Sequence, residues 1–311
     1  MEQGAPTASG QASQAPLGWP GTLVSTDWLA RHLDHPAVRV VDIRGYVKTT
    51  DLGDGKQRAD YVGARDEYEA AHVPGAVYVD WTSDIVDPDD PVPAQLAPPE
   101  RFAALMGRLG IGDETHVVIY DHKGGQFATR LWWALGYYGH DRAAVLDGGW
   151  ARWTAEGRPT SAEIPQPAPA TFTPRPRAER RVTADQVLAH SERGDATIVD
   201  ARDREQYTGA VARGDKGGHI PGARHLPGAS LFNPDGTWKP DEELREIVRA
   251  AGLDEAATGD RPLIAYCNGG VAATTVLFAL DRLGRGGANY DGSWNEWGAD
   301  PRFPAKQGDE P

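Results

Sequence analysis

Short apolar runs alternate with helix-like patterns along most of this chain. In the second half, residues 196–200 and 262–266 are apolar runs of strand length, whereas residues 242–251 and 272–283 have the spacing of helices. Residues 183–192 begin with a capping-box sequence, which predicts the start of a further helix. Such alternation predicts an α/β fold, in which helices cover both faces of a mainly parallel sheet.

The same series of motifs occurs twice and in the same order. The matching segments are 40–44 and 198–202 (Val-Val-Asp-Ile-Arg, Ile-Val-Asp-Ala-Arg), 72–76 and 219–223 (His-Val-Pro-Gly-Ala, His-Ile-Pro-Gly-Ala), 110–111 and 252–253, 118–121 and 264–267, and 147–150 and 291–294 (Asp-Gly-Gly-Trp, Asp-Gly-Ser-Trp). The separation between matching positions falls slowly, from 158 residues between Asp42 and Asp200 to 144 between Asp147 and Asp291. A repeat of this length indicates a duplicated globular domain.

The repeats divide the chain into four parts. Residues 1–19 are small and polar and are predicted to form a disordered tail, and residues 159–180 are rich in proline and are predicted to form an extended linker. Residues 20–158 and 181–300 are the two expected domains. The predicted fold class is therefore α/β, with two tandem domains that each contain a mainly parallel sheet flanked by helices.

Composition and charge argue against several classes of function. The 311 residues carry a formal net charge of -13, and an acidic surface of this kind repels the phosphate backbone of nucleic acids. No apolar run approaches the ~20 residues of a membrane-spanning helix. The amino-terminal segment also lacks the basic start and apolar stretch of a secretory signal. We therefore expect a cytoplasmic protein that binds neither nucleic acid nor membranes.

The chain has a single cysteine, Cys267, which excludes an intrachain disulfide and an all-cysteine metal site. Cys267 follows an apolar strand and precedes a loop that leads into a helix. This loop consists of Asn268, Gly269, Gly270, Val271, Ala272 and Ala273. Inward-facing amides of such a loop, together with the positive end of the helix dipole, stabilise a thiolate and make it available as a nucleophile near neutral pH.

The alternative is a small buried cysteine with a packing role, as is common for an isolated cysteine. The matching position in the first repeat is Asp121, so packing alone does not require cysteine there. We interpret the second repeat as the working copy and the first as a catalytically silent one, in which Asp121 is a capping or interface group.

These motifs resemble those of the tandem-domain rhodanese family, the thiosulfate and 3-mercaptopyruvate sulfurtransferases. The resemblance covers roughly residues 24–297 and includes Arg-Leu-Trp-Trp at 130–133. It implies that Cys267 takes sulfur from a small anionic donor, holds it as a persulfide cradled by the loop amides, and passes it to cyanide or a thiol acceptor. It implies no metal and no organic cofactor, and it makes a thioredoxin-like protein a candidate reductant.

The resemblance also suggests residues that bind the donor. Arg213 roughly matches a family arginine that binds the donor carboxylate, whereas Gln206 stands where another donor-binding arginine is expected. The loop lacks the Arg and Lys of thiosulfate-preferring members, which favours 3-mercaptopyruvate, although Gly269 replaces a serine proposed to assist protonation in that subgroup. Arg202 is a further substrate-binding candidate. Because it recurs as Arg44 in the silent copy, a structural ion pair is the favoured interpretation.

Two histidines, His72 and His219, precede the Pro-Gly-Ala motifs and titrate near neutral pH. Since the copy without cysteine also has one, a shared structural hydrogen bond is favoured over catalysis. His72 and Asp121 remain candidates for the wall of the active-site cleft. Trp150 and Trp294 are interpreted as core or interdomain packing residues.

Two other functions stay open at this point. A cysteine phosphatase or arsenate reductase also uses a thiolate in an amide cradle, but it needs an arginine six residues after the cysteine, where this chain has Ala273. A non-enzymatic redox-sensing or interaction module, in which Cys267 is merely oxidised or modified, is also compatible with the sequence.

Overall fold

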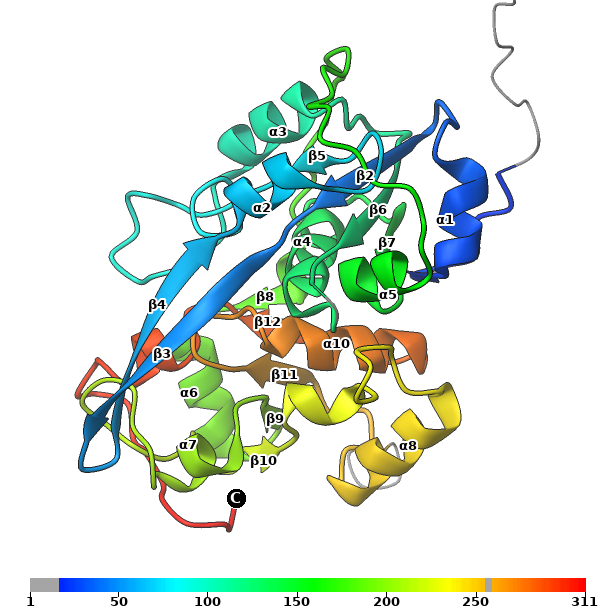
Figure 1. Ribbon diagram of the computed structural model, residues 1–311. Helices are drawn as coiled ribbons and strands as arrows, with labels where there is room; N and C mark the ends of the chain where they lie inside the picture. The colour runs from blue at the N-terminus through cyan, green and yellow to red at the C-terminus, as the bar shows by residue number, and fades with distance from the viewer. Residues whose placement is uncertain (1–16, 123, 255–258) are drawn as a thin grey trace, which may run out of the picture.

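The computed structural model describes residues 17–122, 124–254 and 259–311, and these form two similar α/β domains (Figure 1). The sheet of the first domain contains five parallel strands in the order β1-β7-β6-β2-β5. Their bounds are β1 Leu23–Val24, β2 Val38–Asp42, β5 Val77–Tyr78, β6 His116–Tyr120 and β7 Ala143–Leu146. The surrounding helices are α1 Thr26–His32, α2 Arg65–Ala70, α3 Pro99–Arg108, α4 Gln126–Tyr137 and α5 Gly149–Ala155.

The second domain repeats this arrangement, with five parallel strands in the order β8-β12-β11-β9-β10. Their bounds are β8 Arg181–Val182, β9 Thr197–Asp200, β10 Arg224–His225, β11 Leu263–Tyr266 and β12 Ala288–Tyr290. The helices are α6 Ala184–Arg193, α7 Arg204–Thr208, α8 Asp241–Ala250, α10 Ala273–Arg282 and α11 Ser293–Trp297, with short 3₁₀ turns η1 Ala178–Arg180 and η2 Gly228–Leu231. Each strand occupies the place of its counterpart in the first sheet, so the predicted α/β duplication is confirmed.

The predicted local elements form for the expected physical reasons. The central strand β11 is buried along its whole length, which explains its unbroken apolar sequence. At the start of α6, the Thr183 hydroxyl accepts a hydrogen bond from the Gln186 amide, and the Gln186 side chain accepts one from the Thr183 amide. This is the predicted capping box.

Both ends of the chain differ from the prediction. Of the predicted tail, residues 1–16 lie outside the described residues, but residues 17–19 pack onto the first domain, where the Trp19 ring lies 5.4 Å from that of Trp28. The second domain also continues beyond the predicted end at 300, because Phe303 is buried and Lys306 pairs with His219 through backbone hydrogen bonds. Burial of these apolar side chains accounts for the added order.

One element of the first domain has no counterpart among the described residues of the second. Strands β3 (Gly45–Gly53) and β4 (Lys56–Gly63) form an antiparallel hairpin, which runs from the first domain alongside the second (Figure 1). The hairpin docks onto the second domain, where the Gln57 amide donates to the Ala212 carbonyl at 2.9 Å and the Ala212 amide donates to the Gly55 carbonyl at 2.7 Å. This hairpin was not predicted from the sequence.

A buried ion pair joins the two domains where α4 packs against α10. Arg130 Nη1 lies 2.5 Å from Asp291 Oδ1, and both side chains are almost completely buried. Arg181 Nη2 approaches the other carboxylate oxygen at 3.0 Å. Nearby, the hydroxyls of Thr129 and Thr274 lie 3.0 Å apart across the interface. Among the described residues, no helix has the length and apolar character needed to span a membrane.

We predict that Arg130→Leu lowers the free energy of unfolding by about 3 kcal/mol, because it leaves the buried Asp291 carboxylate with Arg181 as its remaining cation. Urea denaturation measures this difference. As a matched control, Arg58→Leu removes an exposed ion pair with Asp60 and is expected to cost less than about 1 kcal/mol. If both variants lower the free energy of unfolding by the same small amount, the interdomain ion pair does not make the predicted contribution to stability.

Candidate active site

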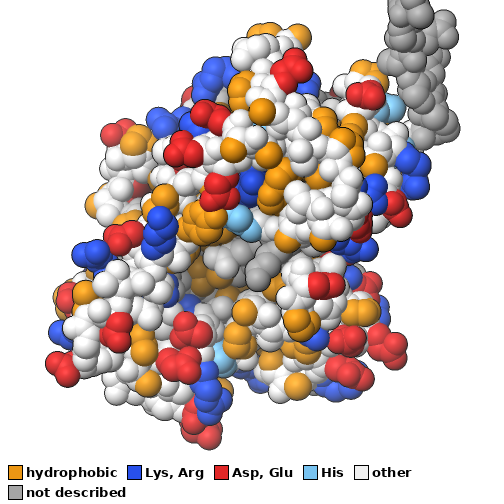
Figure 2. All heavy atoms as spheres, in the orientation of Figure 1, with side chains coloured by type: hydrophobic (Ala, Val, Ile, Leu, Met, Phe, Trp, Pro, Cys, Tyr) orange, Lys and Arg blue, Asp and Glu red, His pale blue; other side chains and the backbone are white. Residues whose placement is uncertain are grey.

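Cys267 directly follows β11 and lies at the carboxyl end of the sheet, where α/β proteins bind their ligands. The residue is 3% exposed, but it lines a cavity of about 620 Å³ between the two domains, here called the interdomain cavity. Residues that line it from both domains include Tyr61, Trp81, Phe127, Arg213, Cys267 and Val271. Figure 2 shows this face of the molecule hollowed between the two domains.

The loop after Cys267 is held in shape by the hydroxyl of Ser293. Ser293 Oγ accepts hydrogen bonds from the amides of Cys267 (3.1 Å) and Gly270 (3.0 Å) and donates to the Tyr290 carbonyl (2.7 Å). Ser293 has a φ of 50°, whereas the matching residue of the first domain is Gly149, with a φ of 53°. Serine therefore occupies a backbone conformation that favours glycine, and the loop gains an anchor that the first domain lacks.

A side chain from each domain holds the same loop at the Gly270 carbonyl, Arg130 from the first domain and Asn289 from the second. The Gly270 carbonyl accepts hydrogen bonds from Arg130 Nη1 at 3.3 Å and from Asn289 Nδ2 at 2.9 Å. Gly270 itself has a φ of 69°, and a Cβ at this position would lie 2.7 Å from the Asp291 carbonyl oxygen. Only glycine fits the loop at this point. The same arginine thus joins the domains and fixes the cysteine loop.

The first domain places a carboxylate at the position of the thiol. Asp121 is buried, and its carboxylate accepts hydrogen bonds from the amides of Gly125 (2.9 Å), Phe127 (2.8 Å) and Ala128 (3.2 Å). Burial raises the pKa of Asp121, and the three amides oppose that rise. Asp121 thus caps the start of α4, as the sequence analysis expected, and it also lines the interdomain cavity.

In the second domain the corresponding amides belong to Val271, Ala273 and Thr274. The Thr274 amide donates to the Val271 carbonyl at 3.1 Å, and the Gly270 amide is taken by Ser293. Within residues 17–122, 124–254 and 259–311, no hydrogen bond reaches the Cys267 sulfur. The prediction that six consecutive amides form a cradle is therefore wrong for Gly270. The amide of this residue donates its hydrogen bond to Ser293 and so stabilises the conformation of the loop. The amides of Val271 and Ala273 remain as the counterparts of those that bind Asp121.

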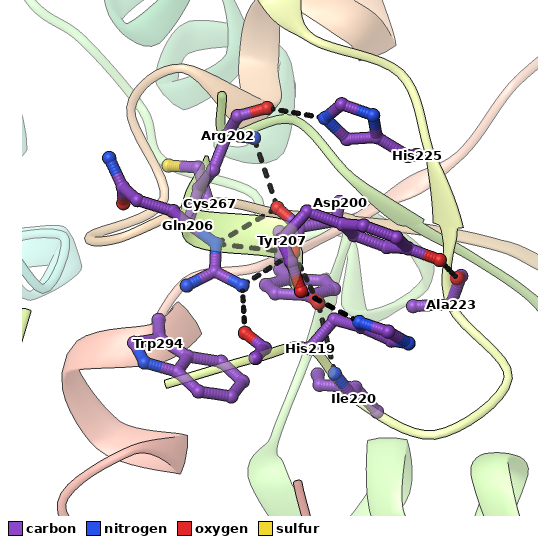
Figure 3. A network of polar contacts seen from close by, with 12 residues as sticks. Asp200, Arg202, Gln206, Tyr207, His219, Ile220, Ala223, His225, Cys267 and Trp294 are labelled. Carbon is purple, nitrogen blue, oxygen red and sulfur yellow. Dashed lines mark hydrogen bonds and ion pairs between the residues drawn. The ribbon is translucent and has the colours of Figure 1, made fainter. Parts of the chain in front are cut away.

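Arg202 belongs to a buried network beside the cysteine. Its Nε donates to Asp200 Oδ1 at 2.9 Å, and Tyr266 donates its hydroxyl proton to Asp200 Oδ2 at 2.6 Å (Figure 3). Burial alone lowers the pKa of Arg202, but the neighbouring Asp200 carboxylate outweighs this effect, so the pKa is raised overall. Figure 3 shows the Cys267 sulfur pointing away from this network.

The first domain contains the same network without the cysteine. Arg44 Nε donates to Asp42 Oδ2 at 2.9 Å, and the Tyr120 hydroxyl donates to the same carboxylate at 2.6 Å. In each domain the guanidinium lies over a tryptophan ring. The Cζ atom of Arg44 is 4.5 Å from the ring centre of Trp150, and that of Arg202 is 4.2 Å from the ring centre of Trp294. The contacts of Arg202 are therefore those of the structural ion pair favoured by the sequence, although its side chain also borders the interdomain cavity.

The two motif histidines are equivalent and buried. His72 contacts the Tyr68 carbonyl through Nδ1 at 2.7 Å and the Glu163 carbonyl through Nε2 at 3.0 Å. His219 contacts two backbone carbonyls in the same way, at 2.8 and 3.0 Å. Each histidine ties the segment that follows its domain back onto the domain. Neither is among the residues that line the interdomain cavity.

Arg213 is held at the cavity by the hairpin of the first domain. Its Nε donates to Gln57 Oε1 at 2.9 Å. In the described part of the chain, neither of its terminal guanidinium nitrogens has a hydrogen-bond partner. Burial lowers the pKa of Arg213, and the neighbouring Tyr61 and Asp203 oppose this effect. Gln206, which replaces an expected arginine, accepts a hydrogen bond from Asn268 Nδ2 at 2.9 Å.

Three residues of the site were not predicted from the sequence: Gln57, Tyr61 and Ser293. The Tyr61 hydroxyl accepts a hydrogen bond from Asn295 Nδ2 at 3.3 Å, and burial raises the pKa of Tyr61. Ser293 could have been found from the difference between the two Asp-Gly-x-Trp motifs. The two hairpin residues carry no such local signal. Within the described ranges, no group of three or more His, Cys, Asp or Glu side chains is placed to hold a metal ion.

The proteins that this chain resembles belong to one family. The profile described as Rhodanese-like domain matches residues 25–156 and again residues 183–300. The sulfur carrier protein TtuD of Thermus thermophilus is 35% identical over 305 residues, which is 94% of this chain and 98% of that protein. The thiosulfate sulfurtransferase of Cricetulus griseus is 35% identical over 286 residues, covering 88% of this chain and 91% of the relative.

Two further comparisons concern a second activity in the same family. The 3-mercaptopyruvate sulfurtransferase of Escherichia coli K12 is 33% identical over 291 residues, or 91% of this chain and 97% of the relative. The crystal structure of SseA from Escherichia coli, described as a 3-mercaptopyruvate sulfotransferase, superimposes with a TM-score of 0.76 and 31% identity. This alignment covers 88% of the present chain and 99% of SseA.

We predict that Arg202→Met and Arg44→Met lower the free energy of unfolding by similar amounts, about 3–5 kcal/mol each, because both leave a buried carboxylate without its cation. Chemical denaturation of the two variants provides the comparison, and Arg44→Met in the first domain is the matched control. If Arg202→Met unfolds like the unaltered protein but binds anionic ligands of the cavity more weakly, Arg202 is a ligand-binding residue instead.

Proposed function

Because this chain belongs to the rhodanese family, whose similar members include sulfurtransferases, we propose that it moves sulfur from a small anionic donor to an acceptor through a persulfide on Cys267. Candidate donors are thiosulfate and 3-mercaptopyruvate, and candidate acceptors are cyanide and thiols. The first domain is the silent partner, and it supplies one wall of the interdomain cavity.

The single observation that carries this proposal is the binding of Asp121 by backbone amides. A carboxylate oxygen of aspartate is separated from Cα by the same number of bonds as the outer sulfur of a cysteine persulfide. Asp121 therefore occupies in the first domain the position that a negatively charged persulfide would take on Cys267. Three amides bind that carboxylate. A loop and helix of the same construction in the second domain can bind an anion in the same place.

The two half-reactions balance without any redox cofactor. The Cys267 thiolate attacks the outer sulfur of the donor, a new sulfur–sulfur bond forms, and sulfite or pyruvate departs as the leaving product. In the second half-reaction, cyanide or a thiolate attacks the outer sulfur. The electron pair of the sulfur–sulfur bond then returns to Cys267. The amides of Val271 and Ala273 stabilise the outer sulfur while it carries negative charge, as oxyanion-hole amides do in acyl transfer.

Arg213 binds the anionic group of the donor. The protein carries a net charge of -13, so a small anion needs local positive charge to enter the cavity. Arg213 provides that charge, and its hydrogen bond to Gln57 leaves the two terminal nitrogens available for a carboxylate or sulfonate group. Because the cavity is open to solvent on the face shown in Figure 2, a thiol of a thioredoxin-like protein is a suitable acceptor as well as a small thiol.

The alternative functions make different predictions for the same cysteine. A phosphatase would need a guanidinium at position 273, and Ala273 is fully buried at the start of α10. A redox-sensing module would form sulfenic acid on Cys267 and would form no persulfide from a donor. Mass spectrometry of the donor-treated protein separates these outcomes.

We predict that the protein gains the mass of one sulfur atom when it is mixed with donor, that Cys267→Ser abolishes this gain and the turnover to thiocyanate, and that the variant remains folded. The reason is that the substitution removes only the nucleophile. Turnover by Cys267→Ser would reject the mechanism. Sulfenic acid without persulfide in the unaltered protein would support the redox-sensing alternative.

We predict that Arg213→Ala raises KM for the donor roughly 10- to 100-fold, as expected for loss of a charge-assisted hydrogen bond, and lowers kcat less, because the anion is bound in both ground and transition states. Steady-state kinetics with each donor measure the effect. Gln57→Leu is the companion variant, which keeps the charge but removes the group that orients it, and a smaller increase in KM is expected. Unchanged kinetics of Arg213→Ala with both donors would remove Arg213 from the site.

A further inference from the structure

The hairpin β3–β4 places a phenol against the cysteine loop from the other domain. The Tyr61 hydroxyl lies 3.4 Å from the point at which a Cβ on Gly269 would stand. It accepts a hydrogen bond from Asn295 Nδ2, and the Asn295 amide donates to the Asn268 carbonyl at 2.8 Å. The hydroxyl is therefore connected to the residue that follows the nucleophile, and it lies in the same cavity as the nucleophile.

One face of strand β4 carries two side chains that reach the interdomain cavity region, one near Arg213 and one near the cysteine loop. Gln57 and Tyr61 are four residues apart, so both side chains point to the same side of the strand. Both are half-buried, whereas Lys56, Arg58 and Asp60 point to solvent. Gln57 orients Arg213, and Tyr61 reaches the cysteine loop. A donor with its anion on Arg213 and its sulfur at Cys267 would lie along this face.

The two donor classes differ in the need for a proton at this place. Thiosulfate releases sulfite, which is stable as an anion. A thiol-bearing α-keto acid releases a carbon: its carbon–sulfur bond breaks, the electron pair passes to the carbon as an enolate, and a proton must be added there to give the methyl group of the product. The number of protons is conserved, because the donor thiol brings one proton that the product carbon finally holds.

We propose that the Tyr61 hydroxyl is the proton donor to the carbon leaving group, and that it thereby makes this site competent for thiol-bearing α-keto acids such as 3-mercaptopyruvate. The proposal rests on the proposed sulfur-transfer function. As the carbon–sulfur bond breaks, the phenol proton moves to the carbon. The phenolate then recovers the proton that the transferred sulfur brought with it, which leaves the persulfide as an anion.

The surroundings of Tyr61 suit this role. Burial raises the pKa of Tyr61, and the nearby Cys267 contributes in the same direction, so the phenol keeps its proton at neutral pH until a stronger base forms. Two titratable groups that line the cavity from the first domain, Asp121 and His122, are engaged by neighbouring groups. Asp121 accepts three amide hydrogen bonds, and the His122 ring lies 3.4 Å from a Glu67 carboxylate oxygen.

The test compares Tyr61→Phe with both donors. Pyruvate formation from 3-mercaptopyruvate is expected to fall at least about 100-fold in kcat, while thiocyanate formation from thiosulfate changes by less than about threefold, because general acid catalysis is needed for the carbon leaving group alone. The matched control is Tyr46→Phe, which removes a hydroxyl from β3 of the same hairpin that is hydrogen-bonded to Glu67. It is expected to leave both activities unchanged.

A second readout follows the proton itself. The unaltered protein should show a solvent deuterium isotope effect on kcat with 3-mercaptopyruvate, and this effect should be absent with thiosulfate. Equal loss of both activities in Tyr61→Phe, or full activity with 3-mercaptopyruvate, would overturn the proposal. An unaltered protein that uses thiosulfate alone would also overturn it, yet sulfur transfer would stand. Failure of the unaltered protein with both donors would instead refute the proposed function.

Discussion

A loop that binds an anion with backbone amides must be fixed from outside, because amides devoted to a ligand cannot also hold the loop together. In this protein the Ser293 hydroxyl fixes the loop after Cys267 from within the second domain, and Arg130 fixes it from the first. Arg130 also forms the buried ion pair with Asp291 that joins the domains. The shape of the cysteine loop and the docking of the two domains therefore depend on the same guanidinium.

Because the domain is duplicated, features that both copies share can be separated from features found in one copy. Both copies have the same strand order, the same Asp–Arg–Tyr network and a buried histidine that contacts backbone carbonyls. Because these features occur in both domains, we assign them a structural role. The copies differ where chemistry is expected: Asp121 stands against Cys267, and Gly149 against Ser293. The hairpin is a further difference, because it exists in one domain and acts on the other. Its residues Gln57 and Tyr61 lie at the cavity of Cys267, which is more than 200 residues away in the chain.

Much of this arrangement could be predicted from the sequence, because the repeated motifs mark strand ends and the capping box marks a helix start. The hairpin could not be assigned in the same way, although the shortening of the repeat separation between Asp42 and His72 records the extra residues. The contacts of the hairpin depend on how the two domains pack. The sequence around Tyr61 has no pattern that indicates the approach of its hydroxyl to Gly269. The predicted end of the second domain was also too early, because Phe303 contributes a single buried ring without a pattern around it.

We propose that backbone amides after Cys267 bind the outer sulfur of a persulfide as the first domain binds the Asp121 carboxylate. A crystal structure of the protein after reaction with thiosulfate tests it most directly. We expect density for a second sulfur bonded to Sγ, within hydrogen-bonding distance of the Val271 and Ala273 amides. A second sulfur that points away from those amides, or a cysteine that stays unmodified while sulfur is transferred, would refute this mode of binding.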